Sequence, residues 1–138
     1  MNIELVKLIS IPSHEDNRGI LSSIEQNEDV PFEIKRVFFI HHITAGRGDH
    51  APIDTDEMLI PVSGSFYVKV FDKNSSKVFF LNDPTKGLYI PRLIYLEMFD
   101  FTENAVCLVL ANTKYDATKY LRTMDDFLSY NTLNFQKN

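Results

Sequence analysis

The stretch AGRGDHAPIDTDEMLIPVSGSF, residues 45–66, carries the clearest signal for the fold of this chain. It begins with glycines, an arginine and a histidine, continues with acidic residues and ends in an apolar run closed by Gly64. Glycines permit sharp backbone turns, and β-rich apolar residues that follow a turn are typical of a strand. The stretch therefore predicts a polar loop over 44–56 that leads into a buried strand and a hairpin.

Segments rich in β-branched and aromatic residues surround this loop on both sides and are separated by turn signals. Strand candidates lie at 3–11, 20–26, 32–43, 57–72, 77–83, 88–101 and 105–113, with turns over 13–19, near 63–64 and over 84–87. We expect roughly eight to ten short strands in total, a number and spacing typical of a β-sandwich, jelly roll or barrel.

The C-terminal part has a different pattern. Apolar and aromatic residues recur there at helical spacing, at Tyr120, Leu121, Met124, Phe127 and Leu128. This spacing predicts one or two short helices over about 116–130, packed against a barrel over about 1–112. With 138 residues, 44% of them hydrophobic and 24% charged, the chain has the size and composition of one folded domain, 1–138.

The charge and the cysteine content exclude several classes of function. A net charge of −5 and a pI near 5.3 argue against a general nucleic-acid binder, because phosphate neutralisation needs a basic surface. The single cysteine, Cys107, lies in an apolar run and cannot form an internal disulfide. The N-terminus lacks a basic region followed by an apolar core, and no apolar run approaches the roughly 20 residues of a membrane span. We therefore expect a cytoplasmic protein that binds neither nucleic acid nor a membrane.

The loop matches part of a known metal-binding pattern. The first signature of the cupin barrel has a glycine, two histidines spaced two residues apart, a glutamate and a closing glycine. The chain supplies Gly46, His50, Glu57 and Gly64 in that order, and Pro52 takes the place of the second histidine. The order of these residues predicts an all-β cupin jelly-roll barrel.

A metal site is not expected in this barrel. The second cupin signature would place a histidine where the chain has Leu96. A transition metal normally needs three or four nitrogen, sulfur or carboxylate ligands, and His50 and Glu57 alone are too few. His41 and His42 are neighbours on a predicted strand, so that we expect them to point to opposite faces.

Six segments in a fixed order narrow the interpretation further. They are NRGIL, VPFEIKRVFFI, GRGDHA, GLYIPRLIYLEMFDF, LANTKYDATKYLR and DDF, and the match runs over about residues 5–130. Their order resembles that of the sugar 3,4-ketoisomerases, which act on dTDP-4-oxo-6-deoxyglucose on the way to 3-amino sugars of bacterial surface polysaccharides. The resemblance implies a cupin without metal or cofactor, a homodimer with strand exchange between subunits, and a dTDP-linked deoxysugar as ligand.

The resemblance also shows where this chain departs from the family. The family loop reads RG-x-HAH, so that His50 corresponds to its first histidine and Pro52 to its second. Other usual residues are replaced: two tyrosines by Phe38 and Phe39, a tryptophan by Tyr95, a histidine by Leu96 and a glutamine by Glu57. Residues at several of these positions would transfer protons in the family. We therefore expect this chain to share the ligand class of the family more closely than its proton-transferring residues.

A 3,4-ketoisomerase removes the proton on carbon 3 of the sugar, next to the carbon 4 ketone, and returns a proton to carbon 4. The reaction needs a base that titrates near neutrality and a second group that serves the oxygens. His50 is the candidate for the base, because histidine titrates near neutral pH. His42 shares strand parity with Arg36 unless a bulge intervenes, and Asp54 and Asp56 fit a solvated acidic loop better than a catalytic role. The candidates for the second group are Asp49, Asp54, Asp56, Glu57, His41 and His42.

The diphosphate of such a ligand requires cations, and its thymine can stack on an aromatic ring. Guanidinium groups match phosphate oxygens in bidentate fashion, and the candidates are Arg36, Arg47, Arg92 and Arg122. Arg36 lies in an apolar strand, where its charge needs either phosphate or a carboxylate as partner. Tyr89 and Tyr95 are the candidates for stacking, with core packing as the alternative.

Three other functions stay open at this point. A dTDP-sugar epimerase would use a His–Asp pair as base and a tyrosine as acid, but the chain is short for that family. A catalytically weakened cupin that only binds a nucleotide sugar fits the replaced proton-handling residues. A metal-dependent cupin oxygenase is disfavoured by the number of ligands.

Overall fold

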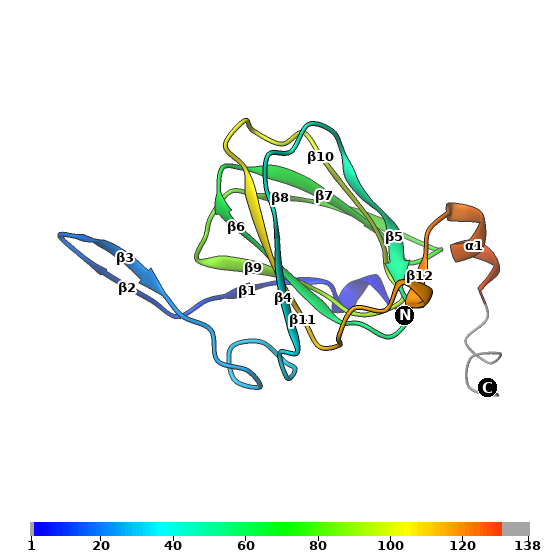
Figure 1. Ribbon diagram of the computed structural model, residues 1–138, viewed down its shortest axis with the longest axis horizontal. Coiled ribbons are helices and arrows are strands. Elements are labelled where there is room, and N and C mark those ends of the chain that lie inside the picture. Colours follow the sequence, from blue (N-terminus) through cyan, green and yellow to red (C-terminus); the bar gives the residue numbers. More distant parts are fainter. Residues whose placement is uncertain (1, 131–138) are drawn as a thin grey trace.

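Two five-stranded antiparallel sheets pack face to face in the computed structural model, which describes residues 2–130 (Figure 1). The first sheet has the order β1 (Lys7–Ser10), β9 (Lys86–Ile90), β6 (Glu57–Ser63), β11 (Val106–Ala111) and β4 (Arg36–Ile40). The second has the order β12 (Tyr120–Leu121), β5 (Arg47–Pro52), β10 (Tyr95–Phe99), β7 (Phe66–Phe71) and β8 (Ser76–Leu81). This architecture confirms the predicted all-β jelly roll.

The core between the sheets follows from the alternation of side chains along the strands. Leu59 of β6 and Leu96 of β10 belong to one buried cluster, to which both sheets contribute. Met58 and Ile60, the neighbours of Leu59, belong to a second buried cluster. Each large apolar side chain that is fully buried stabilises the fold by roughly 1.5–3 kcal/mol. Because β6 is buried on both faces, its first residue, Glu57, is held firmly in place.

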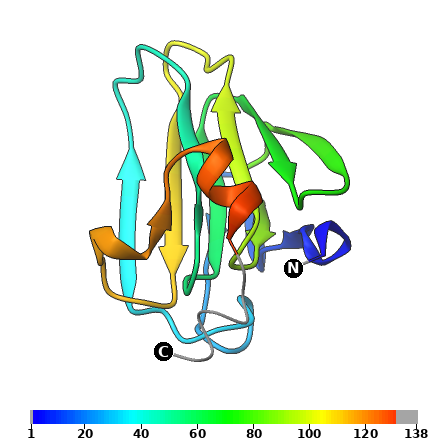
Figure 2. The same ribbon diagram turned by 90° about the vertical axis from the view of Figure 1, so that its right-hand side faces the viewer.

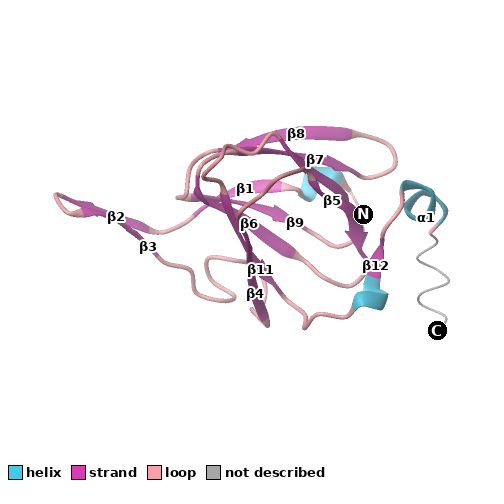
Figure 3. Cartoon of the chain, turned by 45° about the horizontal axis from the view of Figure 1, so that its top comes forward, coloured by secondary structure: helices cyan, strands magenta, loops and turns pink. Residues whose placement is uncertain are grey.

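A two-stranded hairpin, β2 (Ser13–Asp16) and β3 (Gly19–Ser22), projects away from the two sheets (Figures 1 and 3). Within residues 2–130, these two strands pair only with each other. Both are exposed along their whole length, including Ile20 and Leu21. The sequence predicts a turn over 13–19, but the first half of this segment is β2, because it pairs in register with β3.

The predicted loop over 44–56 contains a strand. β5 pairs with β10 on one side and with β12 on the other, and this pairing satisfies backbone groups that a loop would leave to water. The predicted strand over 32–43 is shorter, because β4 ends at Ile40 and His42 has a positive φ of 51°. The N-terminal candidate over 3–11 consists of a 3-10 turn, η1 (Ile3–Leu5), followed by β1.

The C-terminal segment combines a short strand with two short helices, η2 (Ala117–Lys119) and α1 (Met124–Ser129). The prediction of short helices is thus confirmed, but Tyr120 and Leu121 form β12 and pair with β5 instead of continuing a helix. Phe127 of α1 is buried and packs against the ring of Tyr95 in β10. As a result α1 lies against the second sheet beside β5 and β12 (Figure 2).

Candidate active site

A cavity of about 590 Å³ opens between the two sheets. The first sheet contributes residues of β4, β6 and β11 and the residue after β4 to one wall. These residues are Phe38, Phe39, Ile40, His41, Glu57, Leu59 and Val109. The wall on the second sheet consists of Arg47, Gly48, Asp49, His50, Leu96 and Met98, and Arg122 adds to the lining. A ligand in this cavity would contact groups from both sheets at once.

A β-bulge in β5 sets the direction of the His50 side chain. In the ladder between β5 and β10, Leu96 pairs with His50 and Glu97 pairs with Gly48, so that Asp49 is an extra residue. Gly48 and Asp49 both have positive φ angles, 88° and 54°. Glycine adopts this conformation freely, and aspartate is among the few other residues that tolerate it. The GDH sequence therefore suits a bulge that leaves Asp49 exposed and brings His50 into the cavity wall.

His50 is half-buried, and one of its ring nitrogens is already occupied. Its Nδ1 donates to the carbonyl oxygen of Gly48 at 2.9 Å, so that Nδ1 carries the proton and Nε2 keeps its lone pair. Burial lowers the pKa of His50 below 6.5, and the bond to Gly48 acts in the opposite direction. His50 is therefore neutral near pH 7 and has an acceptor nitrogen, as a general base requires.

Glu57 lies in the opposite wall, at the start of β6. It is 4% exposed, and its Cα partners are Ala111 in β11 and Ile90 in β9. Ala111 also pairs with Arg36 in β4, so that Arg36 and Glu57 flank a residue that has only a methyl side chain. Burial raises the pKa of Glu57 to about 7, with Arg36 lowering it and Asp56 raising it further. Both the protonated and the ionised carboxyl are therefore accessible near neutral pH.

Arg36 lies on the same face of β4 as Phe38 but is not part of the cavity lining. Its Nη2 donates to the hydroxyl of Tyr120 at 2.9 Å. Its guanidinium carbon also lies over the rings of Phe38 and Tyr115, 5.1 and 5.4 Å from their centroids. The Nε of Arg36 is buried and has no hydrogen-bond partner within residues 2–130. Arg36 thus holds its positive charge near Glu57 through aromatic contacts and a single side-chain hydrogen bond.

Tyr120 is a residue of this site that the sequence does not reveal. Its hydroxyl accepts the hydrogen bond from Arg36, and its ring meets the His50 ring edge-on, at 87° and a centroid distance of 5.3 Å. The strand that carries Tyr120 has two residues, too few to leave a period of two in the sequence. Tyr120 and Leu121 instead lie at helical spacing from Met124, so that the sequence pattern favours a helix at these residues.

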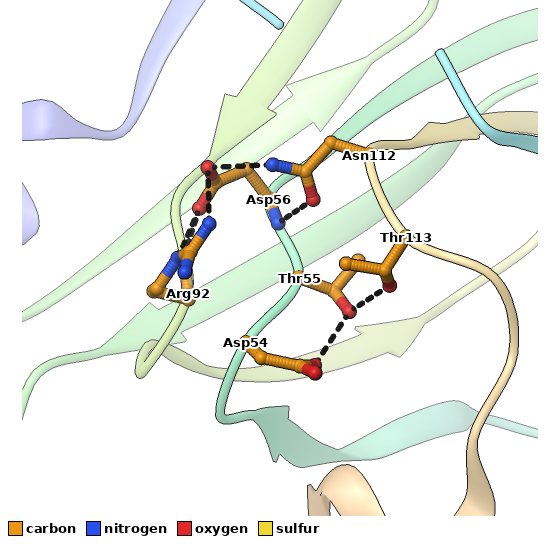
Figure 4. A network of polar contacts seen from close by, with 6 residues as sticks. All are labelled: Asp54, Thr55, Asp56, Arg92, Asn112 and Thr113. Atoms are coloured by element: carbon orange, nitrogen blue, oxygen red, sulfur yellow. Dashed lines mark hydrogen bonds and ion pairs between the residues drawn. The ribbon is translucent and has the colours of Figure 1, made fainter. Parts of the chain in front are cut away.

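The remaining candidate arginines occupy two different places. Arg47 and Arg122 are exposed and line the cavity. Arg92 instead forms an ion pair with Asp56, to which its Nε and Nη2 both donate at 3.1 Å (Figure 4). Asn112 donates a further hydrogen bond to Asp56 at 3.0 Å. The ion pair therefore links the loop that contains Arg92 to the segment before β6. Arg92 is not part of the cavity lining.

The other candidates also lie outside the cavity lining. Tyr89 and Tyr95 pack in buried apolar clusters. His42 is exposed, and its Nδ1 lies 2.7 Å from the Nδ1 of His41, which does reach the cavity. The expectation that these two histidines point to opposite faces is wrong, because β4 ends at Ile40 and the positive φ of His42 turns the chain.

The arrangement is suited to proton transfer on a ligand that carries negative charge. It combines His50 and Glu57 on opposite walls with two arginines in the lining. Among residues 2–130, no three or more His, Cys, Asp or Glu side chains come together in a way that could hold a metal ion. In the same range, no helix has the length and hydropathy to cross a membrane.

Comparison with known proteins agrees with this geometry. The family model described as "FdtA: WxcM-like, C-terminal" matches residues 4–132. The chain is 39% identical over 127 residues to the TDP-4-oxo-6-deoxy-alpha-D-glucose-3,4-oxoisomerase of Aneurinibacillus thermoaerophilus, which covers 90% of this chain and 91% of that protein.

Two solved structures are similar over most of their length. A variant of the 3,4-ketoisomerase QdtA from Thermoanaerobacterium thermosaccharolyticum, in complex with TDP-4-keto-6-deoxyglucose, has a TM-score of 0.86 at 40% identity and covers 89% of this chain and 91% of its own. A 3,4-ketoisomerase from Helicobacter canadensis has a TM-score of 0.87 at 35% identity, with 90% and 95% covered. These findings confirm the resemblance to the sugar 3,4-ketoisomerases. The chain belongs to the FdtA family.

Proposed function

We propose that the chain is a sugar 3,4-ketoisomerase that converts dTDP-4-oxo-6-deoxyglucose to a dTDP-3-oxo-6-deoxyhexose. The observation that carries this proposal is a neutral His50 in the wall of a cavity between the sheets, within a fold shared with 3,4-ketoisomerases. The QdtA variant was solved with TDP-4-keto-6-deoxyglucose, which supports a nucleotide-linked keto sugar as the ligand class. A cavity of about 590 Å³ is in the usual size range of small-molecule sites.

His50 is the general base in this proposal. Its Nε2 takes the proton from carbon 3, which the adjacent ketone acidifies, and returns a proton to carbon 4. Because burial lowers the pKa of His50, the ring is ready to accept a proton near pH 7. The neighbouring carboxylate of Asp49 favours the charged imidazolium that forms, since it acts to raise the pKa of His50.

Arg47 and Arg122 are the proposed contacts of the diphosphate. Both are exposed residues in the cavity lining, where an anionic ligand can reach them without displacing a protein partner from the core. The guanidinium carbon of Arg122 lies 5.2 Å from the centroid of the Tyr120 ring, next to His50. Two guanidinium groups match a diphosphate in charge and in hydrogen-bond geometry.

The proposed assembly is a homodimer with strand exchange through the β2–β3 hairpin. On this hairpin, Ile20 and Leu21 are 57% and 67% exposed. The edge strand β4, which within residues 2–130 pairs only with β11, exposes Val37 and Phe39 at 55% and 61%. Exposed apolar edge strands favour pairing with another chain. The hairpin of one copy and β4 of a second copy are therefore suitable partners.

The chemistry of the product suggests the biological role. A ketone on carbon 3 is the group that an aminotransferase converts to an amine. We therefore place the reaction in the biosynthesis of 3-amino-3,6-dideoxy sugars for bacterial surface polysaccharide, such as the O-antigen of lipopolysaccharide. The proposed location is the cytoplasm, since Cys107 is a buried free thiol and the fold needs no oxidising compartment.

Proton NMR of the protein with dTDP-4-oxo-6-deoxyglucose tests this function. Formation of a 3-oxo product supports the isomerase, and the couplings at carbon 4 give its stereochemistry. Saturable binding of dTDP in calorimetry without any product would instead support a cupin that only binds a nucleotide sugar.

A further inference from the structure

Glu57 is a buried carboxyl group without a polar partner. Its residue is 4% exposed, and it lines the cavity. Its carboxyl group makes no hydrogen bond or ion pair with any residue of the part that the structure describes. Burying such a group without a partner is costly unless it is neutral or a ligand satisfies it. A ligand in the cavity is the partner that its position makes available.

Asp49, the other carboxyl group in the lining, is placed differently. It is exposed at the bulge in β5, where water can solvate it and exchange protons with it. Glu57 is only 4% exposed, and its strand β6 is paired with β11 and β9 on its two sides. Of the two carboxyl groups, Glu57 is therefore the one that can exchange a proton with the ligand in preference to the solvent.

Glu57 and His50 line the cavity from different sheets. Leu59, two residues further along β6, faces the same way and lines the cavity beside Val109 of β11. His50 and Leu96 line the cavity from the second sheet, which packs against the first. A sugar ring bound between the sheets would thus have His50 on one side and Glu57 on the other.

The charged surroundings of Glu57 keep both of its protonation states accessible. On its own sheet and the preceding segment, Arg36 and Asp56 act on it in opposite directions, and burial is the largest influence. The thiol of Cys107 on β11 has a pKa raised to about 12, so that it stays neutral. The titratable and charged groups in the rest of the lining are His41, Arg47, Asp49, His50 and Arg122. None of these groups forms an ion pair with Glu57 within residues 2–130.

We propose that Glu57 is a catalytic residue that carries a proton between the two sugar oxygens during isomerisation. This inference rests on the isomerase activity proposed above and adds the group that serves the oxygens. A group in this role must give a proton to one oxygen and take one from the other, and it must end each turnover in its starting state. A carboxyl group that is protonated at the start fulfils all three conditions.

The two half-reactions balance. In the first, Nε2 of His50 takes the proton from carbon 3, the bonding pair forms the double bond between carbons 3 and 4, and the carbonyl electrons move to the carbon 4 oxygen. That oxygen takes the proton of Glu57, which gives a neutral enediol, an imidazolium and a carboxylate. In the second, the carboxylate of Glu57 takes the proton from the carbon 3 hydroxyl, and a carbonyl forms at carbon 3. The electrons of the double bond then form a bond from carbon 4 to the proton that His50 gives up. Both side chains return to their initial states.

The substitution Glu57→Gln tests the proposal, because glutamine keeps the size and the hydrogen-bonding capacity but cannot transfer a proton. We expect kcat to fall by about 100-fold or more, the usual range for loss of a general acid–base group. Glu103→Gln, at an exposed turn residue, is the matched control and should keep wild-type turnover. A decrease of less than about tenfold in the Glu57 variant would overturn the proposal.

The pH dependence of kcat/KM gives a readout that a purely structural role would not change. The wild type needs neutral His50 and protonated Glu57, so that activity should rise through a pH below 6.5 and fall again above about 7. The residual activity of Glu57→Gln should keep the rising limb and lose the falling one. A falling limb that persists in this variant contradicts the assignment.

The wild-type protein provides the test if the variant does not fold. A wild-type profile of kcat/KM without a falling limb between about pH 7 and 9 would overturn the role of Glu57. These outcomes are distinct from failure of the proposed function. If the wild type forms no 3-oxo product, the isomerase is wrong, whereas product formation that does not depend on Glu57 rejects only this inference.

Discussion

Arg36 donates a hydrogen bond from Nη2 to the hydroxyl of Tyr120, 2.9 Å away and 84 positions further along the chain. This bond connects the first sheet to β12, the strand next to β5 in the second sheet. The Tyr120 ring in turn meets the edge of the His50 ring. Two successive contacts, from Arg36 to Tyr120 and from Tyr120 to His50, therefore link the first sheet to the proposed base.

Tyr120→Phe should lower the free energy of unfolding by about 1–3 kcal/mol, because it leaves the Nη2 of Arg36 without its partner. Urea denaturation monitored by circular dichroism measures the effect. Tyr115→Phe is the matched control, since the Tyr115 side chain is exposed and its hydroxyl makes no hydrogen bond within residues 2–130. Equal losses in the two variants would show that the hydroxyl of Tyr120 does not stabilise the fold.

Glu57 should reduce the stability of the fold as the pH rises. Its pKa is about 7 in the folded state and near 4.5 otherwise, so that between these values the folded state binds more protons than the unfolded state. The free energy of unfolding should then fall with rising pH across this window, by about 3 kcal/mol in total.

Glu57→Gln removes this pH dependence. The variant should therefore have a higher free energy of unfolding than the wild type at pH 8. At pH 4 the two free energies should differ much less, as measured by urea denaturation at both pH values. Glu103→Gln should follow the wild type at both. If Glu57→Gln has the same pH dependence of stability as the wild type, the carboxyl group does not have its raised pKa.

The arginines should differ in their effect on nucleotide affinity. Arg47→Gln and Arg122→Gln should each weaken dTDP binding by about tenfold in titration calorimetry, the loss of one charge-assisted contact. Arg92→Gln should leave the affinity unchanged, because Arg92 is paired with Asp56 outside the cavity lining. A large loss of affinity in the Arg92 variant, with the other two unaffected, would place the diphosphate elsewhere.

Light scattering coupled to size exclusion tests the assembly. The wild type should have twice the 16.0 kDa mass of one chain. Leu21→Glu should shift the mass towards one chain, since it puts a charge on the exposed hairpin that we propose is exchanged. Val78→Glu, at another exposed apolar position in β8, should remain a dimer. A monomeric wild type, or a Leu21 variant that stays dimeric, would contradict exchange through β2–β3.

The fold class was predictable because it depends on local patterns. The continuous apolar run of β6, the alternation along β7 and the turn at Gly64 lie within short windows of the sequence, and they are sufficient to indicate an all-β jelly roll. His50 and Glu57 were recognised from their order in one loop and strand. Both indeed line the same cavity, but their positions on opposite walls follow from how the two sheets pack.

The parts that could not be predicted depend on long-range pairing. Arg92 meets Asp56 across 36 positions, and Tyr120 meets Arg36 across 84, so that neither contact leaves a local signal. The strand β5 could not be predicted from the sequence for a related reason. Its glycines and Asp49 are typical of a loop, and only pairing with β10 around the bulge makes this segment a strand.

The role of His50 as the base of a sugar 3,4-ketoisomerase can be tested by proton NMR with dTDP-4-oxo-6-deoxyglucose in deuterated water, in which the wild type is compared with His50→Asn. Binding of dTDP, measured by calorimetry in parallel, shows that the variant keeps its ligand site. The wild type should form the 3-oxo product and introduce deuterium at carbon 3 or 4, whereas His50→Asn should bind dTDP but lose most of both activities. Near-native product formation by His50→Asn would contradict the assignment of His50 as the base.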